Sequence, residues 1–148
     1  MTDTLRELLK QHDAASHAID VGTCMHEKMR HVFIGGDDSR GDSEIIKKIT
    51  VHKELLQFFD TNSQTEVPVA GFVRGKFISR RIDRMVINHE AKTILILDYK
   101  TDTSPDEHRA AYHAQVAEYV DLLRMIYPKY AVHGFILWLH NFELESVQ

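Results

Sequence analysis

The sequence has a single cysteine, Cys24, among its 148 residues. One cysteine excludes an internal disulfide framework, a cysteine-based zinc site and an iron–sulfur cluster held by this chain alone. No apolar run approaches the roughly 20 residues that a membrane-spanning helix needs, and the first ten residues lack the apolar core of a signal peptide. We therefore expect no membrane partner and a reducing, cytoplasmic location.

An excess of positive charge is also missing, since the formal net charge is -4. This balance argues against nucleic-acid binding by bulk charge. Residues 74–84 are a local exception, with several Arg and Lys side chains and Asp83 as the only acid. A solvated edge strand would explain this stretch too, because charge on an edge discourages aggregation. The chain also lacks a G-x-x-x-x-G-K-[ST] loop, so any ATP-driven motor must lie elsewhere.

The spacing of apolar residues predicts one α/β domain over residues 1–148. Helices are expected at residues 4–32, with a break near residues 20–22, at 43–59 and at 105–127, and strands at 66–73, 76–88, 92–100 and 130–139. Residues 94–97 are apolar on both faces, as in a central strand. The expected architecture is a mixed sheet flanked by helices, in the order ααβββαβ.

The third predicted strand ends in "ILILDYKTD", which places an acid and a base two residues apart. Side chains alternate across a strand, so Asp98 and Lys100 point to the same face. Asp83 lies in the preceding strand, and a tight turn between the two strands can bring its carboxylate close to Asp98. Two such carboxylates repel each other unless one takes up a proton or a divalent cation such as Mg²⁺ binds both.

Lys100 would then orient or deprotonate a metal-associated water, or stabilise charge on a phosphate oxygen. This set suits the metal-assisted hydrolysis of a phosphodiester. A D-x-K pattern by itself is more often a structural ion pair, and that reading stays open at this point.

Four further residues are candidates for the same site. Glu66 opens the first predicted strand as a third acid, and Gly22 lies one helical turn before His26, leaving room beside the imidazole. Gln115 and Tyr119 are also one turn apart, on the helix that follows Lys100. Taken singly, each of these residues is most simply a solvated or hydrogen-bonded side chain.

In chain order, these residues form a recognisable series of motifs. They are Gly22-x-x-x-His26, "EVP" at Glu66, "IDRMV" around Asp83, "LDYKTD" from Leu97 to Asp102 and "QVAEY" from Gln115 to Tyr119. The series resembles the RecB-type branch of the PD-(D/E)XK nuclease superfamily, and most closely the C-terminal nuclease domain of AddA-like helicase–nucleases. The resemblance extends from about Gly22 to His140.

The resemblance implies a restriction-endonuclease-like fold and DNA cleavage that depends on Mg²⁺ or Mn²⁺. It assigns the metal ligands to His26, Asp83, Asp98 and the backbone carbonyl of Tyr99. It makes Lys100 the catalytic lysine, with Glu66 supporting the site and Gln115 and Tyr119 positioning the lysine or the DNA. The chain departs from many relatives in having Arg80 and Arg81 where a small residue precedes the "ID" aspartate; arginines there could contact phosphates.

The resemblance also implies a wider context. The chain would be the C-terminal nuclease domain of a larger helicase–nuclease, an exonuclease-type enzyme acting in double-strand break repair and recombination. Its partners would be DNA, as double-stranded ends or single strands, and a helicase in the same chain or in a partner subunit. A non-catalytic DNA-binding or scaffolding domain that keeps the fold is the alternative. A zinc hydrolase is disfavoured, because the motifs offer one His among carboxylates.

Overall fold

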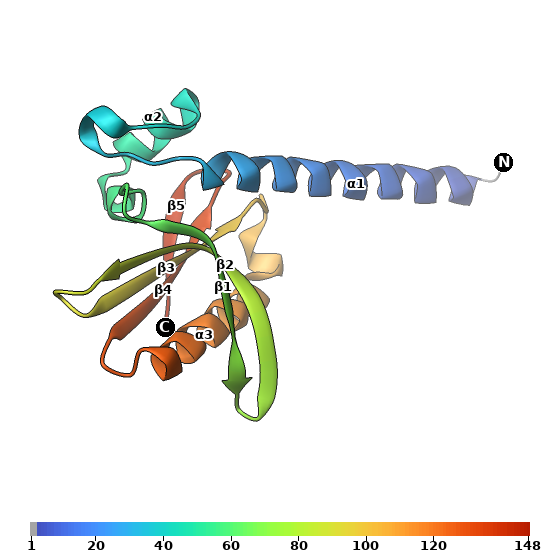
Figure 1. Ribbon diagram of the computed structural model, residues 1–148. Coiled ribbons are helices and arrows are strands. Elements are labelled where there is room, and N and C mark those ends of the chain that lie inside the picture. The colour runs from blue at the N-terminus through green and yellow to red at the C-terminus, as the bar shows by residue number, and fades with distance from the viewer. Residues whose placement is uncertain (1–2) are drawn as a thin grey trace.

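The chain forms a mixed β-sheet with helical layers on its two faces (Figure 1). The computed structural model describes the backbone of residues 3–148 and the side chains of residues 5–11 and 22–148. Within this range five strands lie in the order β1-β2-β3-β4-β5. They are β1 (Gln64–Val73), β2 (Lys76–Asn88), β3 (Thr93–Lys100), β4 (Ala131–Trp138) and β5 (Glu143–Val147). Neighbouring strands are antiparallel, except that β3 and β4 run parallel. The predicted α/β class with a mixed sheet is confirmed.

Helix α3 (Arg109–Ile126) is the crossover between the parallel strands and covers one face of the sheet. Its predicted stripe of Val116, Val120 and Leu123 is buried against that face. Gly134 on β4 permits the close approach, since a Cβ there would lie 2.5 Å from Val116 Cγ1. Alternation along β3 sends Ile96 into this core and Tyr99 into the core on the opposite face.

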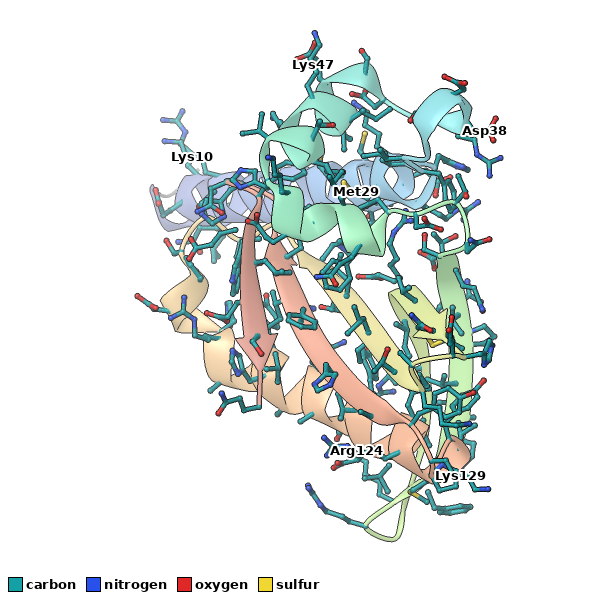
Figure 2. All side chains as sticks on the ribbon, turned by 90° about the vertical axis from the view of Figure 1, so that its left-hand side faces the viewer. Lys10, Met29, Asp38, Lys47, Arg124 and Lys129 are labelled. Carbon is teal, nitrogen blue, oxygen red and sulfur yellow. The ribbon has the colours of Figure 1, made fainter. Side chains whose placement is uncertain are left out.

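The opposite face is covered by the C-terminal end of α1 (Asp3–Arg30), by α2 (Ser43–Val51) and by the 3₁₀ turn η2 (Lys53–Phe58). Met29 of this layer and Arg124 of α3 are labelled in Figure 2. Two shorter 3₁₀ turns, η1 (Gly36–Asp38) and η3 (Pro105–Glu107), lie in the connections. None of the described helices is both long and apolar enough to cross a membrane.

Several predicted elements differ from those observed. The expected break near residues 20–22 is wrong, because α1 continues through Gly22. One glycine costs a helix only about 1 kcal/mol, too little to end it. The predicted helix 43–59 is divided into α2 and η2, and the predicted helix 105–127 begins as η3 before α3 starts.

Strand β5 was not predicted. Its sequence, "ELESV", has too few apolar residues for a clear strand pattern, and it is a strand because its backbone pairs with β4.

Strands β2 and β3 separate near the carboxyl end of β3. Their pairing runs from Asn88↔Thr93 to Arg84↔Leu97 and goes no further in the described register, whereas β3 stays paired with β4 as far as Lys100. The amino-terminal part of β2 pairs with β1 instead, and this hairpin projects from the sheet (Figure 1). The last residues of β3, which are polar, therefore have no strand partner on the β2 side.

Candidate active site

The candidate site lies where β2 and β3 separate. Tyr99 is beyond the last β2–β3 pair, and its backbone N–H donates to Asp83 Oδ2 at 2.8 Å. The aspartate side chain thus replaces the strand partner that the backbone of Tyr99 has lost. A carboxylate between two strands is poorly solvated, and burial raises the pKa of Asp83 to about 7. The charges of Asp98 and Glu66 contribute to this rise, while the Tyr99 hydrogen bond and Lys100 oppose it.

Asp98 is the most buried acid of the site, with 5% of its surface exposed. Lys100 Nζ lies 2.9 Å from its Oδ2, so the acid and the base are side by side as strand alternation predicts. This contact is an ion pair between two largely buried side chains. A carboxylate has more lone pairs than one ammonium uses, so a hard cation could bind Asp98 beside Lys100.

Lys100 is held from three sides. Besides the contact with Asp98, its Nζ donates to Gln115 Oε1 at 2.9 Å and lies 4.3 Å from the centre of the Tyr112 ring. Gln115 Nε2 in turn donates to the hydroxyl of Tyr119 at 2.8 Å. Burial, helped by the negative charge of Asp98, raises the pKa of Tyr119 to about 12. The structure therefore brings Asp98, Lys100, Gln115 and Tyr119 into one connected polar row.

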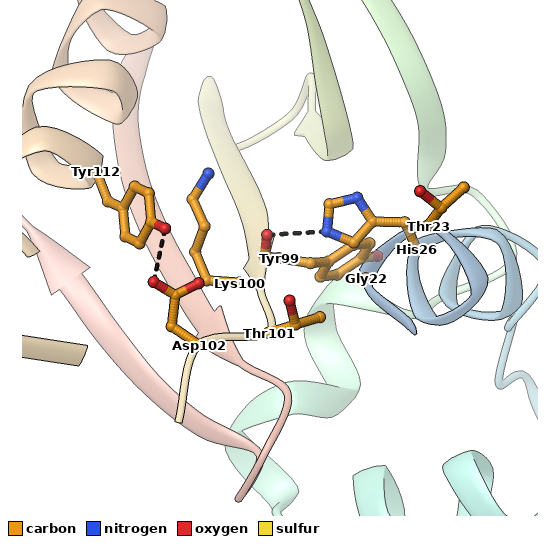
Figure 3. Close-up of a pocket in the computed structure, with 8 residues that line it drawn as sticks. All are labelled: Gly22, Thr23, His26, Tyr99, Lys100, Thr101, Asp102 and Tyr112. Carbon is orange, nitrogen blue, oxygen red and sulfur yellow. Dashed lines mark hydrogen bonds between the residues drawn. The ribbon is translucent and has the colours of Figure 1, made fainter. Parts of the chain in front are cut away.

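Tyr112 and Asp102 are part of the site although they were not predicted. The Tyr112 hydroxyl donates to Asp102 Oδ2 at 2.7 Å (Figure 3). Burial and this bond raise the pKa of Tyr112 to about 12, so the hydroxyl remains a donor at neutral pH. The helical spacing of 112, 115 and 119 places all three residues on one face of α3, and that spacing could have identified Tyr112.

His26 lies on the opposite side of β3 from the lysine. Its Nε2 is 3.0 Å from the carbonyl oxygen of Tyr99, a hydrogen bond that requires the ring proton on Nε2. Gly22 allows α1 to pass close to the end of β3, since a Cβ there would lie 3.3 Å from Thr101 Oγ1. His26, Gly22, Lys100 and Tyr112 line an open pocket of about 410 Å³ (Figure 3).

Glu66 sits in an interruption of the β1–β2 ladder. The register passes from Thr65↔Arg84 to Val67↔Ile82 with no pair between them, and Glu66 has a φ of 54°. A left-handed backbone is unfavourable for glutamate, and such strain often accompanies functional sites. Glu66 Oε2 lies 3.8 Å from Arg81 Nη1, and its charge contributes to the raised pKa of Asp83.

The predicted metal ligands are only partly assembled. In the part of the chain whose side chains are described, no three His, Cys, Asp or Glu side chains gather closely enough to hold an ion. The groups that fit a cation are the carboxylates of Asp83 and Asp98, because they repel each other and Asp98 is buried. The carbonyl of Tyr99 faces His26, which is hydrogen-bonded to it instead of joining the carboxylates.

Arg84 links several segments around the site through hydrogen bonds. Its guanidinium is fully buried and donates to the Tyr99 hydroxyl, to Ser63 Oγ and to the carbonyls of Met29 and Val32, each at 2.8 Å. The two carbonyls lie at the C-terminal end of α1, where a cation is favoured. Arg84 therefore ties α1 to the strand that carries Asp83. From the sequence, Arg84 was interpreted as part of the basic stretch 74–84, and this role was not predicted.

The chain was compared with known proteins. No model of a protein family matches the sequence, and no curated protein matches it either.

Proposed function

We propose that this chain is a Mg²⁺-dependent DNA nuclease domain of the PD-(D/E)XK type, with a restriction-endonuclease-like arrangement of its sheet. The observation that carries the proposal is the buried Asp98 carboxylate, which forms an ion pair with Lys100 and has a second carboxylate, Asp83, near it. The element order supports it, since a helical segment, three antiparallel strands, a crossover helix and a parallel strand follow one another. Mn²⁺ would substitute for Mg²⁺, because both accept oxygen ligands.

The candidate cation ligands are Asp83, Asp98 and the carbonyl of Tyr99, and His26 would join them only after leaving its hydrogen bond to that carbonyl. When bound, Mg²⁺ would polarise the scissile phosphate and make a bound water more acidic.

Side chains of this chain would bind the phosphate and orient the attacking water. Gln115 and the Tyr112 ring hold the ammonium of Lys100 at the mouth of the site, where it can donate to a phosphate oxygen or orient the attacking water. Glu66 would support the site beside Asp83. The expected products are a 5′-phosphate and a 3′-hydroxyl.

By the same resemblance, the domain would act as an exonuclease within a helicase–nuclease, in double-strand break repair and recombination. A helicase in the same chain or in a partner subunit would deliver DNA to it. This context fits the net charge of -4, because a module that a motor places on DNA does not need an overall positive charge to find it.

The test is cleavage of linear duplex and single-stranded DNA with Mg²⁺, comparing the wild-type protein with Asp98→Asn and Lys100→Ala. We expect each substitution to reduce the rate at least 100-fold, since each removes a group that would act on the reacting phosphate. Lys129→Ala is the matched control, as Lys129 is an exposed lysine in the turn before β4. Undiminished cleavage by both site variants would contradict the proposal.

A second candidate function is a non-catalytic DNA-binding or scaffolding domain. It is favoured by one observation, that the ion pair of Asp98 with Lys100 and the bond of His26 to Tyr99 satisfy much of the site without a metal. Calorimetry distinguishes the two functions. Absence of Mg²⁺ and Mn²⁺ binding, together with retained DNA affinity, would support the non-catalytic function.

A further inference from the structure

The β1–β2 hairpin has one covered face and one open face. Val69, Val73 and Ile78 belong to the core beneath α3, and a Cβ at Gly71 would lie 2.6 Å from Leu122. The intervening residues point the other way and are exposed. They are Pro68, Ala70 and Phe72 on β1 and Phe77, Ser79 and Arg81 on β2. We call these six residues the open hairpin face.

Two phenylalanines stand at the tip of the open hairpin face. Phe72 and Phe77 are directly paired across the strands, with ring centres 5.4 Å apart in an edge-to-face arrangement. They nevertheless remain 61% and 58% exposed. Two adjacent exposed rings form a small apolar patch, which is a candidate contact surface. Arg74 and Gly75 close the hairpin with φ of 51° and 77°, values that suit a tight two-residue turn.

The charge around the tip indicates what would cover these rings. Arg74 stands in the turn at the tip, and Arg81 lies on the open hairpin face, whereas Lys76 and Arg80 alternate with its residues and lie on the α3 side. The side chain of Arg74 is 83% exposed, although it contacts Asp121, and that of Arg81 is 66% exposed. Exposed aromatic rings bordered by basic side chains are the combination that binds single-stranded nucleic acid, by base stacking and by phosphate contacts.

The open hairpin face also leads toward the candidate active site. Phe77, Ser79 and Arg81 lie on one side of β2, and Asp83 follows two residues after Arg81 in the chain. At a strand rise of about 3.3 Å per residue, Phe77 lies roughly 20 Å along β2 from Asp83. Arg81 reaches Glu66, which borders the site. A strand stacked on the tip would thus have its backbone directed along β2 to the carboxylates.

We propose that the open hairpin face binds a single strand of DNA, with bases stacked on Phe72 and Phe77, and guides it to the site at Asp83 and Asp98. This assignment rests on the proposed nuclease function and names its substrate as an unpaired strand. Duplex DNA does not offer its base faces for stacking, so the hairpin would select single strands or frayed ends.

The test measures binding separately from chemistry. Fluorescence anisotropy with a labelled oligothymidine, in EDTA, reports affinity for a single strand without cleavage. The double substitution Phe72→Ala with Phe77→Ala is expected to weaken this affinity at least tenfold and to leave affinity for a blunt duplex unchanged. Arg74→Ala with Arg81→Ala is expected to reduce the slope of log affinity against log salt by about 1.4, which corresponds to two lost phosphate contacts.

Two controls define what a loss of affinity means. Val51→Ala alters an exposed apolar residue on α2, and single-strand affinity should not change. Hydrolysis of bis(p-nitrophenyl) phosphate with Mn²⁺, a substrate too small to reach the tip, should be equal in the wild type and in the phenylalanine variant. If this hydrolysis is absent from both, the nuclease function fails while the binding result still stands.

Replacing both rings with leucine distinguishes stacking from general apolar contact. Leucine keeps apolar bulk without a π face, so Phe72→Leu with Phe77→Leu should bind the oligothymidine as weakly as the alanine variant. Wild-type affinity for the oligothymidine in the double alanine or the double leucine variant of Phe72 and Phe77 would overturn the proposal. A second copy of the chain covering the rings would also overturn the proposal. Sedimentation would then show self-association of the wild type that both phenylalanine double variants abolish, while affinity for the oligothymidine persists.

Discussion

The backbone N–H of Tyr99 donates to the side chain of Asp83 at 2.8 Å, at the point where β2 stops pairing with β3. A titratable side chain therefore occupies a place that backbone normally fills in a sheet. The bond holds the carboxylate near Asp98, and the desolvation that accompanies it keeps the pKa of Asp83 near 7. Strand pairing and proton binding are coupled through this one contact.

The first prediction concerns stability against pH in the presence of EDTA. The pKa of Asp83 is about 7 in the folded protein and about 4 in an unfolded chain. Between these values the folded state binds more protons, so this carboxyl lowers the free energy of unfolding as pH rises from about 4 to 7. Asn does not titrate. Asp83→Asn should therefore gain stability over the wild type across that window, by at most about 4 kcal/mol above pH 7.

Urea unfolding at pH 4.5, 6 and 8 measures this difference. Asp37→Asn, which removes an exposed carboxyl on η1, is the matched control for the loss of a carboxylate. Parallel pH profiles for the wild type and Asp83→Asn would contradict the assigned pKa.

The second prediction concerns proton release on metal binding. A cation must displace the proton that Asp83 holds below pH 7, so binding at pH 6 should release close to one proton and binding at pH 8 close to none. Calorimetry with Mn²⁺ in buffers of different ionisation enthalpy counts these protons. Asp83→Asn should bind more weakly and release no proton at either pH. Equal proton release by the wild type at both pH values would argue against a site at Asp83.

The third prediction concerns the buried guanidinium of Arg84. Arg84→Lys keeps the charge but cannot reach four acceptors at once, so carbonyls at the end of α1 lose their partners. We expect a loss of about 3 kcal/mol in the free energy of unfolding, measured with urea. Arg30→Lys is the control, because Arg30 pairs with Glu27 at the surface and such pairs contribute little. A loss below about 1 kcal/mol for Arg84→Lys would mean that the network is not what joins α1 to β2.

The fourth prediction concerns the role of Tyr112 in positioning Lys100. Tyr112→Phe keeps the ring 4.3 Å from the lysine ammonium and loses only the bond to Asp102, so the turnover number should change less than threefold. Tyr112→Leu removes the ring, and a cation–π contact of about 1 kcal/mol corresponds to a loss of roughly fivefold in turnover. KM for DNA should change little in both variants. A rise in KM with an unchanged turnover number would instead place Tyr112 in DNA binding.

Much of the polar row could be predicted from local periodicity. Alternation along β3 places Asp98 beside Lys100, and helical spacing places Gln115 beside Tyr119; both relationships are present. The same reasoning could not find the role of Arg84, because its partners at positions 29, 32 and 63 are distant in sequence. The unbroken α1 and the short β5 were also missed, since each depends on contacts with the rest of the fold.

The sequence by itself determined the mixed α/β class, the apolar stripe of α3 and the placing of Asp98 and Lys100 on one face, because these follow from the fixed periods of strands and helices. Only the tertiary structure decided that β2 and β3 separate at Asp83, that His26 bonds to the carbonyl of Tyr99, and that Phe72 and Phe77 stand uncovered at a hairpin tip. These depend on which segments meet and where pairing stops. The local order of residues predicts neither which segments meet nor where strand pairing stops.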